Sequence, residues 1–223
     1  MSVQAIDTAL VMKVLDPIWS IKPETAGRLR GRIESVLDWA TVRGFRQGEN
    51  PARWRGHLAK LLPAQAKVRK VKHHDAAAYC ELPSFMASLR RRQSVSARAL
   101  EFTILTAART SEAIGAQWSE FDLRARLWTV PAGRMKAGKE HRVPLSERAL
   151  AVLKLMPQDG DVVFPGAKAD RPLSNMAMLE LVRGLRGKGA TVHGFRSTFR
   201  DWAAERTNFP SEVVEMALAH ASN

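Results

Sequence analysis

The sequence is poor in cysteine and tyrosine, with one residue of each, and it has no long apolar run. A single cysteine, Cys80, cannot form a disulfide within the chain, which favours an intracellular, cytoplasmic protein. One cysteine among six scattered histidines also argues against a structural zinc site, so neither a metal nor another cofactor is expected. No stretch approaches the roughly 20 apolar residues that span a bilayer, and the first residues do not form a signal peptide. We therefore expect no membrane segment.

Acidic residues are outnumbered, and this imbalance points to a polyanionic partner. The chain has 22 Asp and Glu against 35 Lys and Arg, which gives a formal net charge of +13 and a pI near 10.7. Such a field attracts nucleic acid, the commonest polyanion in a cytoplasm. A basic protein without such a partner is the alternative. An anionic membrane surface is disfavoured, because the sequence has no strongly amphipathic basic anchor.

Residues 1–62 have the pattern of helices. Pro23 suits the first turn of a helix whose apolar residues recur at helical spacing up to Ala40, and Gly44 is placed to end it. Asn50-Pro51 is expected to start a short further helix. Arginines occupy much of the remaining surface, where they either line a DNA backbone or form a solvated face: Arg28, Arg30, Arg32, Arg43 and Arg46. Of these, Arg28 and Arg32 are our candidates for contact with DNA.

Residues 63–75 are expected to be a basic linker between two domains. They contain no hydrophobic period, and they carry four further candidates for contact with DNA: Lys67, Arg69, Lys70 and Lys72. A basic connector suits a protein that closes around DNA, while a solvated loop is the default for such a segment. The run His73-His74-Asp75 does not predict a metal site, because adjacent side chains of an extended segment point apart.

A second, larger domain is expected from residue 76 onwards, mainly α-helical with one small antiparallel β-hairpin. The hairpin strands are 127–130 and 141–145, on either side of a turn rich in Gly and Lys, and Pro144 places the second strand at a sheet edge or at its own end. Residues 162–164 are a candidate short strand. Helices are expected at 82–92, 95–108, 146–156, 175–186, 194–206 and 210–219.

Three stretches carry residues suited to binding an anion. In the first, a helix ends at Arg109, and Thr110 or Ser111 is expected to cap a new helix with Glu112 in its first turn. A guanidinium beside a helix N-terminus is well placed for a phosphate oxygen. Taken alone, the same residues favour a local ion pair between Arg109 and Glu112.

The second stretch is the hairpin turn, which contains Gly133, Gly138 and Lys139 at the spacing of a nucleotide-binding P-loop. Glu140 stands where that motif requires Ser or Thr, and a strand follows in place of a helix, so nucleotide binding is rejected. A lysine at the tip of a hairpin can instead reach into a DNA groove. A solvated turn lysine is the alternative.

The third stretch runs from His193 to Arg196 and is followed by a helix and then by His220. A histidine and an arginine three positions apart share one face of a helical turn, which places a hydrogen-bond donor beside a fixed cation. An isolated pair of this kind is a weak signal, because such pairs arise often by chance.

The combination of an arginine after a helix, a hairpin lysine, the His193–Arg196 pair and a late histidine, in this order, is specific. With it the chain resembles the tyrosine recombinase, or phage integrase, family, and in particular the integrases of prophages and genomic islands. The segments that carry the resemblance are TAARTSEAIGAQWSEFD, MKAGKEHRVPLS, VHGFRSTFRDWAAE and VVEMALAH. They lie within residues 76–223, for which the resemblance implies the catalytic-core fold of the family. It also implies that residues 1–62 are part of a helical core-binding domain.

The resemblance implies a role for each residue of the pattern. Arg109 and Arg196 would clamp the phosphate at which DNA is cut, with Glu112 orienting the first arginine. His193 would be a hydrogen-bonding or proton-handling group beside them, and His220 would donate to a non-bridging oxygen. The reaction of the family needs no metal: a tyrosine attacks the phosphate to give a 3′-phosphotyrosyl intermediate, and a 5′ hydroxyl then reverses the step.

Two lysines and a set of partners complete what the resemblance implies. Lys136 would be the general acid that protonates the departing 5′ oxygen, with Lys139 as the less favoured candidate. The partners would be double-stranded DNA, further copies of the chain in a homotetramer on that DNA, and accessory DNA-bending proteins. The protein would be bacterial or phage-encoded and would act in DNA integration and recombination.

The sequence departs from the family at the nucleophile. The family places its tyrosine a turn or two beyond the last histidine, whereas this sequence ends at Asn223, three residues after His220. The one tyrosine, Tyr79, lies far earlier in the chain and has the character of a core or surface residue. We therefore expect residues 76–223 to be a catalytic domain truncated before its nucleophile, which binds a phosphate without cutting the strand. The alternatives are a non-catalytic DNA-binding remnant or regulator that occupies recombination sites, and a helix-turn-helix regulator, to which the two arginines would be irrelevant.

Overall fold

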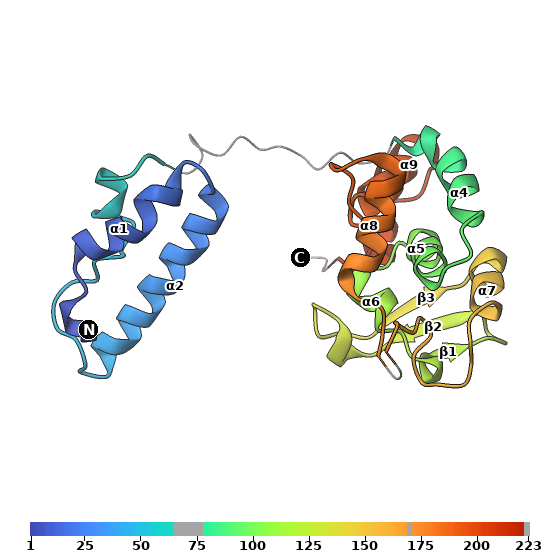
Figure 1. Cartoon of the computed structure of the whole chain (residues 1–223), viewed down its shortest axis with the longest axis horizontal. Coiled ribbons are helices and arrows are strands. Elements are labelled where there is room, and N and C mark those ends of the chain that lie inside the picture. The colour runs from blue at the N-terminus through green and yellow to red at the C-terminus, as the bar shows by residue number, and fades with distance from the viewer. Residues whose placement is uncertain (65–77, 169–170, 221–223) are drawn as a thin grey trace. The chain divides into compact units, whose positions relative to one another are not determined.

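The structure, a computed structural model, describes residues 1–64, 78–168 and 171–220 (Figure 1). The chain forms two compact units, a first unit of Met1–Lys72 and a second unit of His73–Asn223. Four of the candidates for contact with DNA lie outside the described residues: Lys67, Arg69, Lys70 and Lys72.

The first unit consists of two long helices packed around a small core. A 3-10 turn (Val3–Ala5) precedes α1 (Thr8–Trp19), which begins where the Asp7 side chain accepts a hydrogen bond from Leu10 N at 2.9 Å. As expected, α2 (Pro23–Val42) has its proline in the first turn, and Gly44 follows its end in a left-handed conformation, φ +75°. The buried residues of this core are Val11, Leu15, Trp19, Ala26, Leu37, Ala52, Leu58 and Leu62.

The prediction that a short helix starts at Asn50-Pro51 is wrong. The chain makes turns there, and a 3-10 helix (Leu58–Lys60) is the one helical element between α2 and the end of the described range at residue 64. The Asn50 side chain instead anchors the loop, because its amide nitrogen donates to the Glu34 carbonyl at 2.8 Å and its oxygen accepts from Ala52 N at 2.9 Å. These bonds hold the segment against α2 in place of a helical hydrogen-bond ladder.

Two of the five arginines considered for a DNA-facing surface are structural. The Arg46 side chain is buried and donates to the carbonyl oxygens of Val3 at 2.9 Å and Ile6 at 2.7 Å. Arg30 donates to the Ala52 carbonyl at 2.8 Å and so ties α2 to the following loop. Backbone carbonyls that are partly or fully buried need donors, and these two guanidiniums supply them.

The second unit is mainly α-helical around one small antiparallel sheet, as the sequence predicts (Figure 1). The sheet has the order β1-β2-β3, and Trp128 pairs with Val143 across its last two strands. Its strands are β1 (Phe121–Asp122), β2 (Leu127–Val130) and β3 (His141–Pro144), so the proline lies on an edge strand. The helices are α4 (Leu82–Arg90), α5 (Val95–Thr106), α6 (Thr110–Ile114), α7 (Glu147–Lys154), α8 (Asn175–Arg186), α9 (Gly194–Arg206) and α10 (Ser211–Ala217).

The candidate strand at 162–164 is not formed. Val162 makes a single antiparallel bridge with Gln117, and Val163 N donates to the Ala116 carbonyl at 2.9 Å. The pairing goes no further because the partner segment turns at once into a 3-10 helix (Trp118–Glu120).

The core of the second unit surrounds α5. Phe102 packs against Trp128 and Phe164, with ring centroids 5.3 and 5.4 Å apart. On another side of α5, the buried Glu101 carboxylate accepts hydrogen bonds from Arg90 on α4 and Arg148 on α7, both at 2.7 Å. Burial raises the pKa of Glu101, but the hydrogen bonds from Arg148 and Arg90 outweigh it, so the pKa lies below its usual value. These contacts fix the position of α5, whose C-terminal end leads into the candidate site.

Candidate functional site

The candidate site begins where α5 gives way to α6. Arg109 occupies the N-cap position of α6, and Glu112, three residues on, is 2% exposed. The Glu112 carboxylate accepts from Arg109 N at 2.9 Å and from Arg109 Nη1 at 2.8 Å. The expectation that Thr110 or Ser111 caps this helix is therefore wrong, because Glu112 reaches back to the Arg109 backbone. The local ion pair is present, and it fixes the orientation of the guanidinium.

Arg196 is buried near the start of α9. It is 6% exposed, and its Nη1 and Nη2 atoms donate to the carbonyl oxygens of Ala107 and Leu218. Its Nε atom is also buried and has no hydrogen-bond partner among the described residues. Burial, followed by the nearby Arg109 charge, lowers the pKa of Arg196, yet a guanidinium keeps its proton in proteins. A permanent cation therefore lies in the interior of the second unit.

Two alanines in left-handed conformations aim their carbonyl groups at these arginines. Ala107 (φ +50°), at the end of α5, accepts from Arg196, and Ala219 (φ +48°), just beyond α10, accepts from Arg109 Nη2 at 3.0 Å. A left-handed alanine costs about 1 kcal/mol, a strain that the surrounding structure must offset. Both carbonyls lie at helix C-termini, where the helix dipole favours a cation. The ends of α5 and α10 thus hold the two guanidiniums in place.

His220 joins the same group of side chains. Its Nε2 atom lies 3.2 Å from Arg196 Nη2, and its Nδ1 atom contacts the Glu215 carboxylate. The ring itself is exposed. We call Arg109, Glu112, Arg196 and His220 the arginine cluster. The structure brings these four residues together, although they come from two separate sequence stretches and the C-terminal turn.

The remaining candidates of the second unit lie at the surface. His193 is exposed at the N-cap position of α9, three residues before Arg196. Lys136 and Lys139 are exposed in the loop between β2 and β3, and neither makes a hydrogen bond or ion pair within the described parts of the chain. This geometry leaves both ammonium groups available to a partner.

The base of the lysine loop is tied to the arginine cluster. Arg134, in the 3-10 turn Ala132–Arg134, donates to the Glu112 carbonyl at 2.5 Å and pairs with Glu120. A Cβ atom at Gly115 would lie 3.0 Å from Arg134 Nη2, so glycine at this position leaves room for the guanidinium. The hairpin that carries the lysines is therefore anchored directly to α6.

Sequence patterns do not single out two residues of this region, His141 and Glu215. His141 is the half-buried first residue of β3, and its ring is hydrogen-bonded to the Ala217 backbone. Burial lowers its pKa, the Glu112 charge opposes this, and Arg109 adds to the lowering. Alternation along the strand could have indicated that His141 points inward, because residue 141 faces the same side of β3 as the buried Val143. Glu215 offered no such signal.

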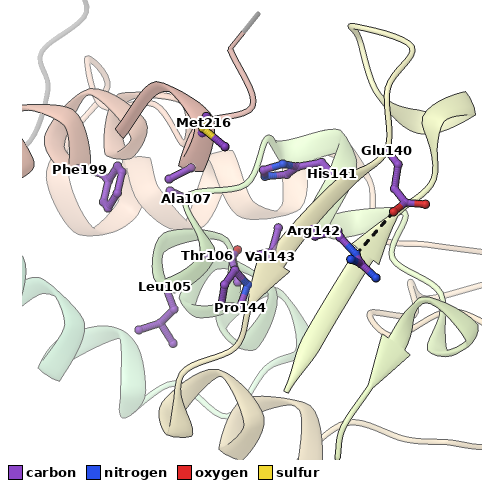
Figure 2. A pocket seen from close by; sticks show the side chains of 11 residues that line it. Leu105, Thr106, Ala107, Glu140, His141, Arg142, Val143, Pro144, Phe199 and Met216 are labelled. Atoms are coloured by element: carbon purple, nitrogen blue, oxygen red, sulfur yellow. Dashed lines mark ion pairs between the residues drawn. The ribbon is translucent and has the colours of Figure 1, made fainter. Parts of the chain in front are cut away.

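A pocket of about 530 Å³ opens beside His141 (Figure 2). Figure 2 shows the His141 ring reaching from β3 toward Ala107 and Met216. Apolar side chains such as Phe199 form much of its wall, and neither Arg109 nor Arg196 lines it. The pocket therefore lies next to the arginine cluster and is not part of it.

The candidates of the first unit are exposed on α2. Arg28 and Arg32 lie four positions apart, so they share one face of the helix. Arg28 pairs with Glu24 at 2.6 Å, and both side chains remain largely exposed. An exposed pair of this kind contributes little to stability, so its arginine can exchange the carboxylate for another anion.

The described parts of the chain contain no group of three or more His, Cys, Asp and Glu side chains that could hold a metal ion. Among the described helices, none is long and apolar enough to cross a membrane.

Comparisons with known proteins establish the family of the chain. Residues 79–223 match the sequence profile of the phage integrase family, and residues 1–57 match that of the phage integrase central domain. The chain is 34% identical over 203 residues to the prophage integrase IntZ and 32% identical over 227 residues to the prophage integrase IntA, both of Escherichia coli K12. These alignments cover 89% and 98% of this chain but 48% and 53% of the relatives. The chain thus spans about half the length of these relatives.

Solved structures share the fold. The integrase of the Tn1549 transposon, in complex with circular intermediate DNA, matches 100% of this chain and 80% of its own, with a TM-score of 0.71 and 12% identity. A lambda integrase dimer bound to a COC′ core site matches 98% of this chain and 80% of its own, with a TM-score of 0.69 and 16% identity. Identities this low establish the fold alone. The sequence profile covers more than half of the residues, and the chain therefore belongs to the phage integrase family of tyrosine recombinases.

Proposed function

We propose that this chain binds double-stranded DNA and holds the phosphate at which a strand is cut and rejoined in site-specific recombination. The arginine cluster carries this proposal. Two guanidiniums and an imidazole, fixed in advance by carbonyls and by Glu112, can meet the charge that develops on a phosphoryl group. The net charge of +13 adds long-range attraction for DNA.

The chemistry follows from the donors available. A tyrosine oxygen forms a bond to phosphorus while the bond from phosphorus to the 5′ oxygen breaks, which leaves a 3′-phosphotyrosyl link. The departing oxygen needs a proton, and Lys136 on its exposed hairpin is our first choice as the donor, with Lys139 second. The tyrosine hydroxyl must lose its proton, and His193, three residues before Arg196, would accept it. Religation by a 5′ hydroxyl reverses these steps and needs no nucleotide cofactor.

Tyr79, the one tyrosine of the 223 residues, is poorly placed to be this nucleophile. Its hydroxyl donates to Glu205 at 2.9 Å and accepts from Arg206 Nε at 3.0 Å. Arg206 lies ten residues after Arg196 on α9, which is about 15 Å along the helix axis. We therefore expect this 223-residue polypeptide to bind DNA without forming a covalent adduct.

Strand exchange between two duplexes involves four strands, and a homotetramer on DNA supplies one copy of the arginine cluster for each. We include this assembly, and accessory DNA-bending proteins, in the proposal. A closed symmetric arrangement is the usual form of such oligomers.

Charge removal on α2 tests whether the first unit contacts the DNA backbone. The double variant Arg28→Gln, Arg32→Gln should weaken binding of a short duplex and reduce the slope of log Kd against log salt concentration by about 2, because each phosphate contact contributes about 0.9. Fluorescence anisotropy over a series of salt concentrations measures both quantities.

A matched control separates contact from overall charge. The double variant Arg124→Gln, Lys154→Gln removes the same charge from exposed positions of the second unit. If this control changes the slope equally, Arg28 and Arg32 act only through the overall charge of the chain and do not contact the DNA backbone directly. Failure of the unchanged chain to bind any duplex would overturn the proposed function itself.

A further inference from the structure

Glu215, in the last turn of α10, contacts His220 of the arginine cluster with one carboxylate oxygen and forms an ion pair with the other. Oε2 contacts His220 Nδ1, and Oε1 pairs with Arg200 Nε at 3.0 Å. The hydrogen bond with His220 lowers the pKa of Glu215, and the Arg200 charge adds to this. Arg200 lies one turn after Arg196 on α9. The Glu215–His220 pair is thus contacted at both ends by arginines of one helix.

The partners of His220 determine which of its ring nitrogens carries the proton. Nδ1 faces an ionised carboxylate, which can only accept a hydrogen bond, so Nδ1 carries a proton. Nε2 lies 3.2 Å from Arg196 Nη2, which can only donate, so Nε2 accepts. In the neutral ring, the hydrogen bond at one nitrogen thereby decides the state of the other.

An unusual turn makes the contact between residues five apart. Ala219 adopts φ +48°, and His220 N donates to the Glu215 carbonyl at 2.9 Å. This is the hydrogen bond of a helix end that reverses on a left-handed residue. The buried Leu218 anchors the turn below the surface. The backbone therefore returns the His220 ring to the side chain of Glu215.

We propose that Glu215 is a positioning residue that fixes the orientation and the tautomer of His220, so that Nε2 points at the phosphate bound by Arg196. This inference rests on the proposed function and extends it to a residue outside the arginine cluster. In metal sites, a carboxylate that accepts a hydrogen bond from a ligating histidine fixes the orientation and the tautomer of the ring in the same way.

The carboxylate also has a consequence for the bound state. His220 can donate from Nε2 to a phosphate oxygen only as an imidazolium, because Nδ1 already holds the proton of the neutral ring. Among the described residues, the charged groups that contact this ring are Glu215 on α10 and Arg196 on α9, and Arg200 pairs with the Glu215 carboxylate. In such an imidazolium, the Glu215 carboxylate would balance the positive charge at Nδ1, and a bound DNA phosphate would accept the hydrogen bond from Nε2.

The test reads the protonation of each His220 nitrogen from ¹⁵N NMR shifts at neutral pH, with His220→Asn used to assign the signals. In the neutral ring of the free chain, we expect the proton on Nδ1 and none on Nε2. Glu215→Ala removes the contact that holds the ring in place, so Nε2 should no longer face Arg196 and the free ring should lose its preference for Nδ1. Glu215→Gln keeps an acceptor oxygen at this position, so the neutral ring should still carry its proton on Nδ1.

Glu212 provides the matched control, because it is exposed on the same helix and its side chain makes no hydrogen bond or ion pair within the described residues. Glu212→Ala and Glu212→Gln should leave the His220 signals unchanged. A free chain with Nε2 protonated, or a Glu215→Ala variant with the unchanged tautomer, would overturn the positioning role. Absence of duplex binding by the unchanged chain would instead count against the proposed function, and the tautomer in the free chain would still be measurable.

Discussion

Replacing Arg196 with lysine is expected to lower the free energy of unfolding of the second unit by about 3 kcal/mol, because hydrogen bonds from a charged donor to buried acceptors are lost. The guanidinium reaches two carbonyls at once, those of Ala107 and Leu218. A lysine keeps the charge but presents a single ammonium, which cannot reproduce a planar fork. Binding of a short duplex should weaken by roughly tenfold or more, equivalent to about 1.4 kcal/mol. Urea unfolding, followed through the indole signal of Trp128, and fluorescence anisotropy measure the two effects.

Arg200→Lys is the control for this substitution. Arg200 lies on the same helix, but its side chain is 62% exposed and pairs with a partly exposed carboxylate. Its replacement should change the free energy of unfolding by less than about 0.5 kcal/mol. The account fails if the two lysine variants unfold at the same urea concentration and bind the duplex equally well.

Replacing Glu112 with glutamine should destabilise the second unit by about 3 kcal/mol, because it leaves buried positive charge without its partner. The carboxylate faces Arg109 directly, and its charge also acts on Arg196. A glutamine retains one acceptor oxygen and turns an amide donor toward a guanidinium. Inorganic phosphate should raise the melting temperature of the variant more than that of the unchanged chain, because the anion can take the place of the lost charge.

Glu147→Gln removes a carboxylate of the same type from the surface, where Glu147 pairs with Arg126 and its side chain is 77% exposed. It should leave both the stability and the response to phosphate unchanged. Thermal unfolding of the three proteins with and without phosphate makes the comparison. A Glu112→Gln variant as stable as the Glu147→Gln variant would contradict the role given to Glu112.

Long amphipathic helices could be predicted closely from the sequence. The structure confirms the predicted bounds of α8 (Asn175–Arg186) and α9 (Gly194–Arg206), because their apolar residues recur at helical spacing and each helix ends at a break in that pattern. Short elements could not be predicted in this way. The two-residue strand β1 is too short to show a period, and the loop at Asn50 depends on tertiary hydrogen bonds from one side chain.

The same distinction applies at the candidate site, where local contacts could be predicted and contacts that depend on the tertiary structure could not. The Arg109–Glu112 pair could be predicted because it is local, three residues apart. The carbonyls of Ala107 and Ala219 could not, because nothing about an alanine indicates a left-handed conformation that glycine adopts more readily. Glu215 escaped prediction for the same reason, since its contact with His220 depends on the turn at Ala219. Burial of Arg46 likewise depends on distant carbonyls that no local pattern shows.

The most direct test of the central claim is an NMR titration of the chain, labelled with ¹⁵N in its arginine side chains, with a short DNA duplex. We predict that the guanidinium signals of Arg109 and Arg196 shift on binding, while that of Arg124, in the exposed turn between β1 and β2, stays in place. Duplex binding that shifts only exposed arginines and leaves Arg109 and Arg196 unmoved would contradict the claim that the arginine cluster holds a DNA phosphate.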